Sequence, residues 1–232
     1  MISFLLASIA LCMLALAATA ARLRRAAPVG APLVAVVCVG LAYDCAAIAV
    51  GPVLGFGSAL HAVNQPRYWI HAVLTPLMIL AVMDLAARAG VVSLARRPVR
   101  IGLGALTAVL VALGVASDVV ALRLAPETYA DTLRYVNDAA EGPPVPAIVT
   151  ILVLIGIGAA LWRRAGVPWL CLGSVAMFVA AAAGFAHFWI GNTGELLLQA
   201  GIVATLAAVA ARTSPAHASA PTPQPQPTPE TA

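Results

Sequence analysis

The sequence predicts an all-α, polytopic membrane protein, a bundle of seven transmembrane helices. Of its 232 residues, 62% are hydrophobic and only 9% are charged, whereas soluble domains average about 45–50% apolar and about 25% charged residues. A helix that crosses a bilayer needs about 20 mostly apolar residues, and inside lipid such a segment must be helical to pair its backbone groups. Seven segments fit, at residues 2–21, 30–53, 68–87, 101–122, 146–162, 168–189 and 195–211.

The same composition excludes a soluble enzyme, a disordered protein and a nucleic-acid-binding protein. The formal net charge is only +4, and every basic side chain is an arginine because the chain has no lysine. The arginines lie between the apolar segments, which is typical of membrane topology and not of a phosphate-binding face. The expected partner is therefore the lipid bilayer, with no nucleic acid, and the oligomeric state is left open.

The distribution of arginines predicts the orientation. If the seven helices alternate in direction, ten arginines fall on one side and only Arg67, Arg123 and Arg134 on the other. The positive-inside rule then places the N-terminus outside and the C-terminus in the cytoplasm. We expect a multi-pass protein of the cell membrane, specifically a bacterial cytoplasmic membrane. The alternative is that residues 1–21 are a cleaved signal peptide, but the arginines follow this apolar run and do not precede it.

Two regions lie outside the predicted spans. Residues 1–212 form the transmembrane domain, and residues 213–232 are a proline-rich cytoplasmic tail, a composition typical of disordered polyproline II chain. The longest outer loop, 123–145, is predicted to hold a short amphipathic helix on the membrane surface, acting either as a connector or as a lid. Its apolar residues recur at helical spacing, at Tyr129, Leu133, Val136 and Ala140.

Ionisable residues inside predicted spans are the first candidates for a site, because each costs about 2.5–3.5 kcal/mol at the bilayer centre. Asp84 has Arg88 one helical turn away, which predicts an interfacial ion pair. Asp44 lies about 21 Å into its helix, and no cation is within one turn of it in the sequence. Without a partner on another helix, the Asp44 carboxyl would be protonated and could act as a proton donor. The alternative is that Asp44 makes a polar contact that holds two helices together.

Other polar residues fall at the same outer depth on separate helices. Arg67, His71 and Thr75 are four residues apart, so they share one face of the third helix, which Pro76 is expected to kink. A tight turn is predicted at residues 190–194, between the last two spans. The sequence thus predicts an outer-half pocket with Asp44, His71 and Glu195 as catalytic residues and Arg67, Asp118, His187, Asn192 and Gln199 as substrate-binding residues. No cofactor and no metal are expected, because the four cysteines show no metal-ligand spacing.

Three short motifs suggest a resemblance. Over residues 30–211 the sequence resembles a family of small, uncharacterised bacterial membrane proteins with seven helices. The motifs that carry this resemblance are Tyr43-Asp44, the run from Pro66 to His71 and the run from Gly191 to Glu195. More distantly, an acid in the second span and another at the seventh are similar to membrane-bound terpene cyclases. That resemblance implies that Asp44 and Glu195 start an isoprenoid cyclisation. The seven-helix zinc hydrolases, such as alkaline ceramidases, are a third comparison, but their HxxxH pair is missing.

Three functions remain open on the sequence alone. The first is an enzyme that protonates a lipid or isoprenoid entering from the bilayer. The second is a non-enzymatic binding, sensing or assembly protein, in which Arg67 binds a head group. The third is a proton-coupled permease, although such carriers usually bind near the bilayer midplane. Whether the protein is an enzyme is not decided by composition.

Overall fold

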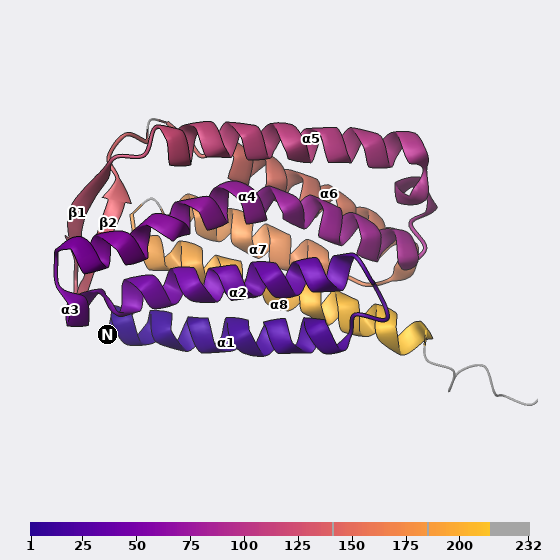
Figure 1. Cartoon of the computed structure of the whole chain (residues 1–232). Coiled ribbons are helices and arrows are strands. Elements are labelled where there is room, and N and C mark those ends of the chain that lie inside the picture. Colours follow the sequence, from indigo (N-terminus) through magenta and orange to yellow (C-terminus); the bar gives the residue numbers. More distant parts are fainter. Residues whose placement is uncertain (141, 185, 214–232) are drawn as a thin grey trace, which may run out of the picture.

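The computed structural model describes residues 1–140, 142–184 and 186–213. Successive long helices run in opposite directions along one bundle axis (Figure 1). These helices are α1 (Ile2–Arg22), α2 (Gly30–Ala49), α4 (Ser58–Arg88), α5 (Arg97–Val115), α6 (Val145–Ala165), α7 (Trp169–Ala183) and α8 (Phe188–Thr213). The shorter elements are α3 (Gly51–Leu54), the 3₁₀-helix η1 (Val92–Ala95), the π-helix η2 (Ala116–Val120) and the strands β1 (Leu124–Tyr129) and β2 (Thr132–Asn137).

The helix lengths confirm an all-α, multi-pass membrane protein. Within the described residues, six helices are long and apolar enough to cross a membrane, namely α1, α2, α4, α5 together with η2, α6 and α8. Helix α7 has 15 residues and is about 22 Å long, shorter than the hydrocarbon core of about 30 Å. The predicted tail lies outside the described residues, apart from Thr213 at the end of α8.

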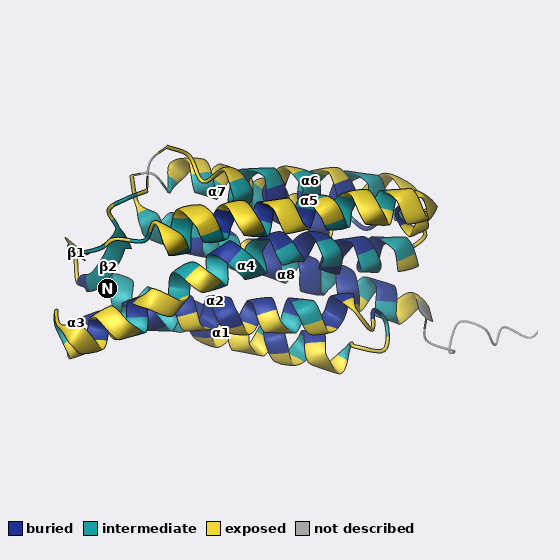
Figure 2. Ribbon diagram, turned by 45° about the horizontal axis from the view of Figure 1, so that its top comes forward, coloured by how far each residue is buried: buried dark blue, intermediate teal, exposed yellow. Residues whose placement is uncertain are grey.

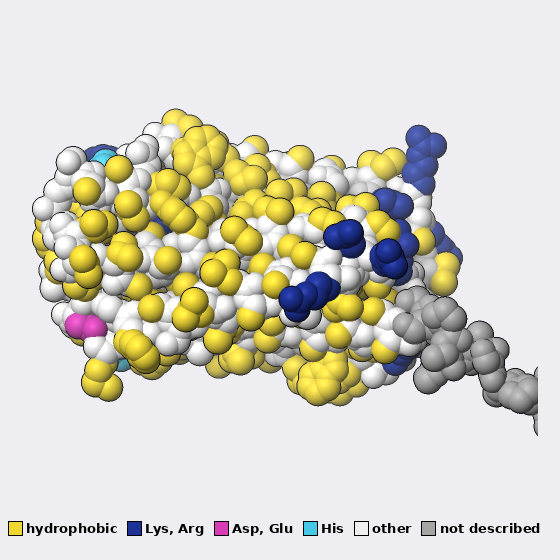
Figure 3. Space-filling model, turned by 60° about the horizontal axis from the view of Figure 1, so that its bottom comes forward, with side chains coloured by type: hydrophobic (Ala, Val, Ile, Leu, Met, Phe, Trp, Pro, Cys, Tyr) yellow, Lys and Arg dark blue, Asp and Glu magenta, His cyan; other side chains and the backbone are white. Residues whose placement is uncertain are grey.

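The two ends of the bundle differ in chemistry. Hydrophobic side chains cover the flank seen in Figure 3, and arginines gather at the end opposite the β-hairpin. We call these the arginine end and the hairpin end. The helix bounds place ten arginines at the arginine end, at or beside the ends of α1, α4, α6 and α8 and the start of α5: Arg22, Arg24, Arg25, Arg88, Arg96, Arg97, Arg100, Arg163, Arg164 and Arg212. Here the predicted Asp84–Arg88 pair is confirmed, with Arg88 Nε 3.1 Å from Asp84 Oδ1, and the second oxygen accepts from the backbone N–H of Gly30 at 2.9 Å.

Close helix packing depends on small residues. Helices α2 and α4 lie in the middle of the bundle, whereas α1 and α5 expose one face along their length (Figure 2). A Cβ on Gly201 of α8 would lie 2.5 Å from the carbonyl oxygen of Trp169 on α7, and one on Gly173 would lie 2.9 Å from that of Leu197. Small residues at such crossings let two backbones approach, which is how membrane helices gain packing energy.

The predicted amphipathic helix in the outer loop is wrong. Strands β1 and β2 form an antiparallel hairpin in which Tyr129 pairs with Thr132 across a two-residue turn. The first turn residue, Ala130, has φ of +50°, a conformation that a helix does not allow. The helical spacing of apolar residues was misleading, because threonines, tyrosines and a valine in this segment favour a pleated strand.

Two predicted boundaries also differ. Helix α4 begins at Ser58, ten residues before the predicted span, and contains both Pro66 and Pro76. The turn predicted at residues 190–194 is wrong, because α8 already begins at Phe188. Gly194 packs on α7, where an added Cβ would lie 2.4 Å from the Cβ of Ala180. Glycine and asparagine suggested a turn by local preference, but tertiary packing uses Gly194 as a contact between helices.

Candidate functional site

The site is built around Asp44, whose side chain on α2 is only 1% exposed. Arg67 on α4 donates from Nε to Asp44 Oδ1 at 2.7 Å, and Asn192 on α8 donates from Nδ2 to Oδ2 at 3.2 Å. The hypothesis of an unpaired, neutral Asp44 is therefore wrong. The partner is 23 residues away in the sequence, so a search within one helical turn could not find it. Asp44 is a buried carboxylate in an ion pair, as a buried charge requires.

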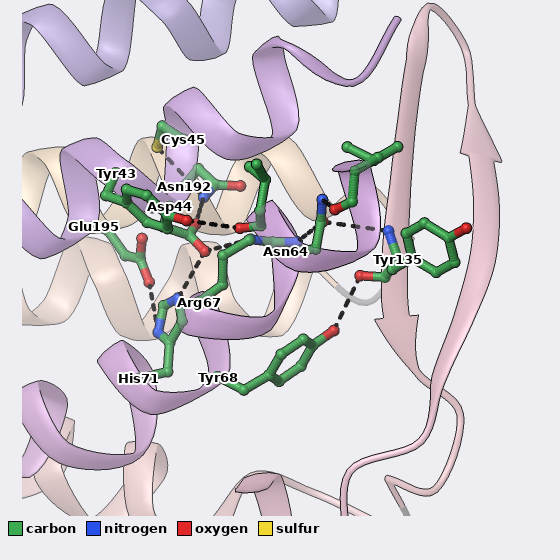
Figure 4. A network of polar contacts seen from close by, with 12 residues as sticks. Tyr43, Asp44, Cys45, Asn64, Arg67, Tyr68, His71, Tyr135, Asn192 and Glu195 are labelled. Atoms are coloured by element: carbon green, nitrogen blue, oxygen red, sulfur yellow. Dashed lines mark hydrogen bonds and ion pairs between the residues drawn. The ribbon is translucent and has the colours of Figure 1, made fainter. Parts of the chain in front are cut away.

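His71 lies between two carboxylates (Figure 4). Its Nε2 is 3.4 Å from Asp44 Oδ1, and its Nδ1 is 3.8 Å from Glu195 Oε1. The predicted common face of Arg67 and His71 is confirmed, because both reach the same oxygen of Asp44. The other oxygen of Glu195, Oε2, is buried and has no hydrogen-bond partner among the described residues. The four side chains thus form one continuous polar cluster across α2, α4 and α8.

The cluster is tied to the hairpin through residues that the sequence analysis missed. Arg67 donates from Nη1 to Asn64 Oδ1 at 2.9 Å, and the same oxygen accepts the backbone N–H of Tyr135 on β2 at 3.3 Å. The hydroxyl of Tyr68 donates to the carbonyl of Tyr135 at 3.2 Å. Asn64 lies three residues before Arg67, a spacing that could have suggested contact on one helix face. The hairpin itself could not have been suggested in this way.

A cavity of about 250 Å³ opens beside His71 and Glu195, and we call it the inner cavity. Most of its walls are apolar side chains of α2, α4, α6, α7 and α8, including Leu41, Met78 and Leu198. The polar part of the lining consists of His71, Thr75, Asp118, Glu195 and Gln199. An apolar pocket with a few converging polar groups is typical of a small-molecule site.

A second cavity, of about 600 Å³, adjoins the first, and we call it the side cavity. It lies between the end of α5 and the start of α6, and both cavities are lined by Asp118, Pro144 and Pro146. Asp118 belongs to the π-helix η2 and accepts a hydrogen bond from Ser117 Oγ at 3.1 Å. Single π-turns occur frequently at functional sites, and this one places an acid where the two cavities meet.

The structure sorts the eight predicted site residues into three groups. His71, Glu195, Asp118 and Gln199 line the inner cavity. Asp44, Arg67 and Asn192 are not among the described residues that line it, and Arg67 and Asn192 each donate to Asp44. His187 is the exception, because its Nδ1 is 2.6 Å from the hydroxyl of Tyr129 on the hairpin and it lines neither cavity. The structure therefore does not bring His187 together with the other seven, because α8 begins one residue later and the side chain contacts the hairpin.

Asp44, His71 and Glu195 lie close enough together to be considered as ligands of one metal ion. Each offers one ligand atom, and these atoms lie within 4.8 Å of one another. However, the Asp44 oxygen nearest His71 already accepts from the Arg67 guanidinium. A metal ion bound to that oxygen would lie against a second cation, which like-charge repulsion disfavours. The donor set therefore fits an ion-pair network better than a metal centre.

No protein-family model matches the chain, and no curated protein or solved structure matches it either. The geometry of the polar cluster and of the two cavities therefore carries the functional argument.

Proposed function

We propose that the protein binds a small amphiphile from the bilayer in the inner cavity and transfers a proton to or from it through Glu195 and His71. The observation that carries this proposal is the mixed lining, an apolar cavity whose polar part holds a carboxyl group and an imidazole. Glutamate and histidine are common general acids and bases. A lipid or an isoprenoid has the long apolar body that such walls would bury.

The roles follow from the contacts of each side chain. Glu195 lines the cavity, with one oxygen toward His71 and the second buried without a hydrogen-bond partner among the described residues, and we propose that a ligand in the cavity supplies the missing donor. His71 connects Glu195 to Asp44, and it can pass a proton between the cavity and the buried pair. Asp44 and Arg67 are positioning residues, because neither is among the described residues that line the cavity. Of the two acids suggested by the terpene-cyclase resemblance, we assign proton transfer to Glu195 alone.

We also propose seven spans, with the N-terminus outside and the C-terminus cytoplasmic. Ten arginines at one end of an alternating bundle support this orientation, and α7 would cross as a short span in a locally thinned bilayer. Reporter fusions after Arg25, Gly55, Arg97, Gly142 and Arg164 should report inside, outside, inside, outside and inside. A cytoplasmic signal at Gly142 would contradict the proposed orientation.

The catalytic proposal is tested by turnover of membrane lipid extract. The purified protein in lipid nanodiscs is incubated with extract, and products are identified by mass spectrometry. We expect Glu195→Gln and His71→Gln to abolish the change seen with the unaltered protein. The matched controls are Asp138→Asn and His61→Gln, an acid and an imidazole that are exposed at the same end of the bundle. Equal turnover in all four variants would refute the assigned roles.

A second function, ligand sensing without turnover, has one observation in its favour. The chain of contacts from Arg67 through Asn64 to Tyr135 connects the polar cluster to the hairpin. A ligand that shifts His71 would then change how the hairpin sits on the bundle. If the extract is bound but not converted, and hydrogen exchange of the hairpin amides slows on binding, sensing is the better description.

A further inference from the structure

We infer that the amphiphile is cationic, a hydrophobic amine, and that it reaches the inner cavity through the side cavity past Asp118. This inference rests on the proposed function and names the ligand class of the same site. It follows from which charges face the two cavities and which are already paired elsewhere.

The lining of the two cavities is acidic. Among the described residues that line them, Asp118 and Glu195 are acidic, none is an arginine, and the basic side chain is His71, which lies between the carboxylates of Asp44 and Glu195. The chain has no lysine to supply a cation from elsewhere. A phosphate or carboxylate head group in the inner cavity would therefore lie beside carboxyl groups, with only an imidazole that two carboxylates already share, and an unpaired buried charge is costly.

Of the three arginines at the hairpin end, Arg67 and Arg134 already have carboxylate partners, and Arg123 is exposed and lines neither cavity. Arg67 donates to Asp44 and to Asn64. Arg134 lies on the hairpin, with Nη2 2.5 Å from Glu127 Oε1 and its guanidinium carbon 3.7 Å from the centre of the Phe188 ring. Binding of an anionic head group through Arg67, which the sequence suggested, is therefore not supported. The guanidinium would have to leave Asp44 as a buried carboxylate without its cation.

An acceptor without a partner belongs to a residue of the cavity lining. Glu195 lines the inner cavity, and its Oε2 is buried without a hydrogen-bond partner among the described residues. A buried acceptor without a donor lowers the stability of the fold until a donor reaches it. An ammonium N–H both satisfies this oxygen and balances its charge, whereas a hydroxyl does only the first. The hydrocarbon tail of the amine would lie along the apolar walls, which include Leu41, Met78 and Leu198.

The position of Asp118 gives the route. Residues exposed at the surface, including Ala140 and Pro143, line the side cavity, so a ligand can reach it from outside the bundle. Asp118 lines both cavities, and a cation moving inward would meet it before Glu195. Two acids in succession attract a cation and repel an anion.

The test compares three ligands with the same ten-carbon tail: decylamine, decanol and decyl phosphate. Binding to the full-length protein in phosphatidylcholine nanodiscs is measured by titration calorimetry, with empty nanodiscs to subtract partitioning. The amine is protonated at pH 7, as a lysine side chain is. We expect saturable binding of decylamine, about tenfold weaker binding of decanol because a charge-assisted hydrogen bond is lost, and no saturable binding of decyl phosphate.

Two variants test whether the bound amine contacts Glu195 and Asp118. Glu195→Gln and Asp118→Asn should each weaken decylamine binding about tenfold, while Asp138→Asn leaves it unchanged. If Glu195→Gln does not fold, Asp118→Asn still tests the inference, because its side chain lies at the cavity junction and not in the buried cluster. Equal binding of decanol or decyl phosphate, with dependence on Glu195, would overturn the ligand class and leave the proposed function standing. Absence of saturable binding for all three ligands would overturn both.

Discussion

Arg67→Met removes the cation from a buried ion pair and should be strongly destabilising. The side chain of Asp44 is 1% exposed and that of Arg67 is 12% exposed, so water cannot take over the lost contact. Removing one partner of a buried pair costs about 3–5 kcal/mol. Asp44 keeps Asn192 at 3.2 Å and His71 at 3.4 Å, and we therefore expect a loss near the lower limit, about 3 kcal/mol.

The double variant Asp44→Asn/Arg67→Met separates the charge from the packing. It removes the carboxylate at residue 44 together with its cation, so it should recover about 2 kcal/mol relative to Arg67→Met alone. Reversible unfolding by SDS in mixed micelles, followed by circular dichroism, gives both free energies. Arg123→Met, an exposed arginine at the same end of the bundle, is the control and should unfold like the original protein. The electrostatic reasoning is refuted if Arg67→Met costs less than about 1 kcal/mol or if the double variant is no more stable than Arg67→Met.

Three further predictions concern the packing of the helices and the docking of the hairpin. Gly201→Ala should lower the free energy of unfolding by about 1–3 kcal/mol in the same assay, because its Cβ would lie 2.5 Å from the Trp169 carbonyl oxygen. The control is Gly156→Ala on α6, whose Cβ would meet nothing within 4 Å. This variant should be as stable as the original protein or more stable, because alanine favours a helix over glycine. Gly51→Ala would place a Cβ 1.8 Å from the Leu133 carbonyl, and it should detach β2 and speed hydrogen exchange at Tyr135; unchanged exchange would contradict the close approach. Asp131 accepts hydrogen bonds from the amino group of Met1 and the backbone N–H groups of Ile2 and Ser3, and these hold its pKa below the usual range. Its contribution to stability is therefore present above about pH 4 and is lost as the pH falls through the lowered pKa; Asp131→Ala should remove this pH dependence and expose the first amides of α1 to exchange.

Much of the candidate site could be predicted because membrane burial makes polar residues conspicuous. Asp44, His71 and Glu195 were singled out since few ionisable residues occur within apolar spans. Their common depth followed from counting residues along alternating helices, and the structure brings them together. The pairing of Asp44 with Arg67 could not be predicted, because it depends on how α2 and α4 are rotated against each other. That rotation pairs the expected acid with Arg67 and leaves Glu195 in the lining of the inner cavity.

By itself the sequence determined that this is an all-α, multi-pass membrane protein with its arginines at one end, because hydrophobic length and charge placement act locally along the chain. The tertiary structure alone decided that residues 124–137 form a hairpin and that η2 places Asp118 between two cavities. Only the structure shows that α8 begins at Phe188 and brings Asn192 to Asp44. The physical reason is that the hairpin and the buried carboxylate are stabilised by partners distant in the sequence, Asn64 for the hairpin and Arg67 for Asp44. Residue spacing and secondary-structure propensity describe only neighbours along the chain, so they cannot predict these contacts.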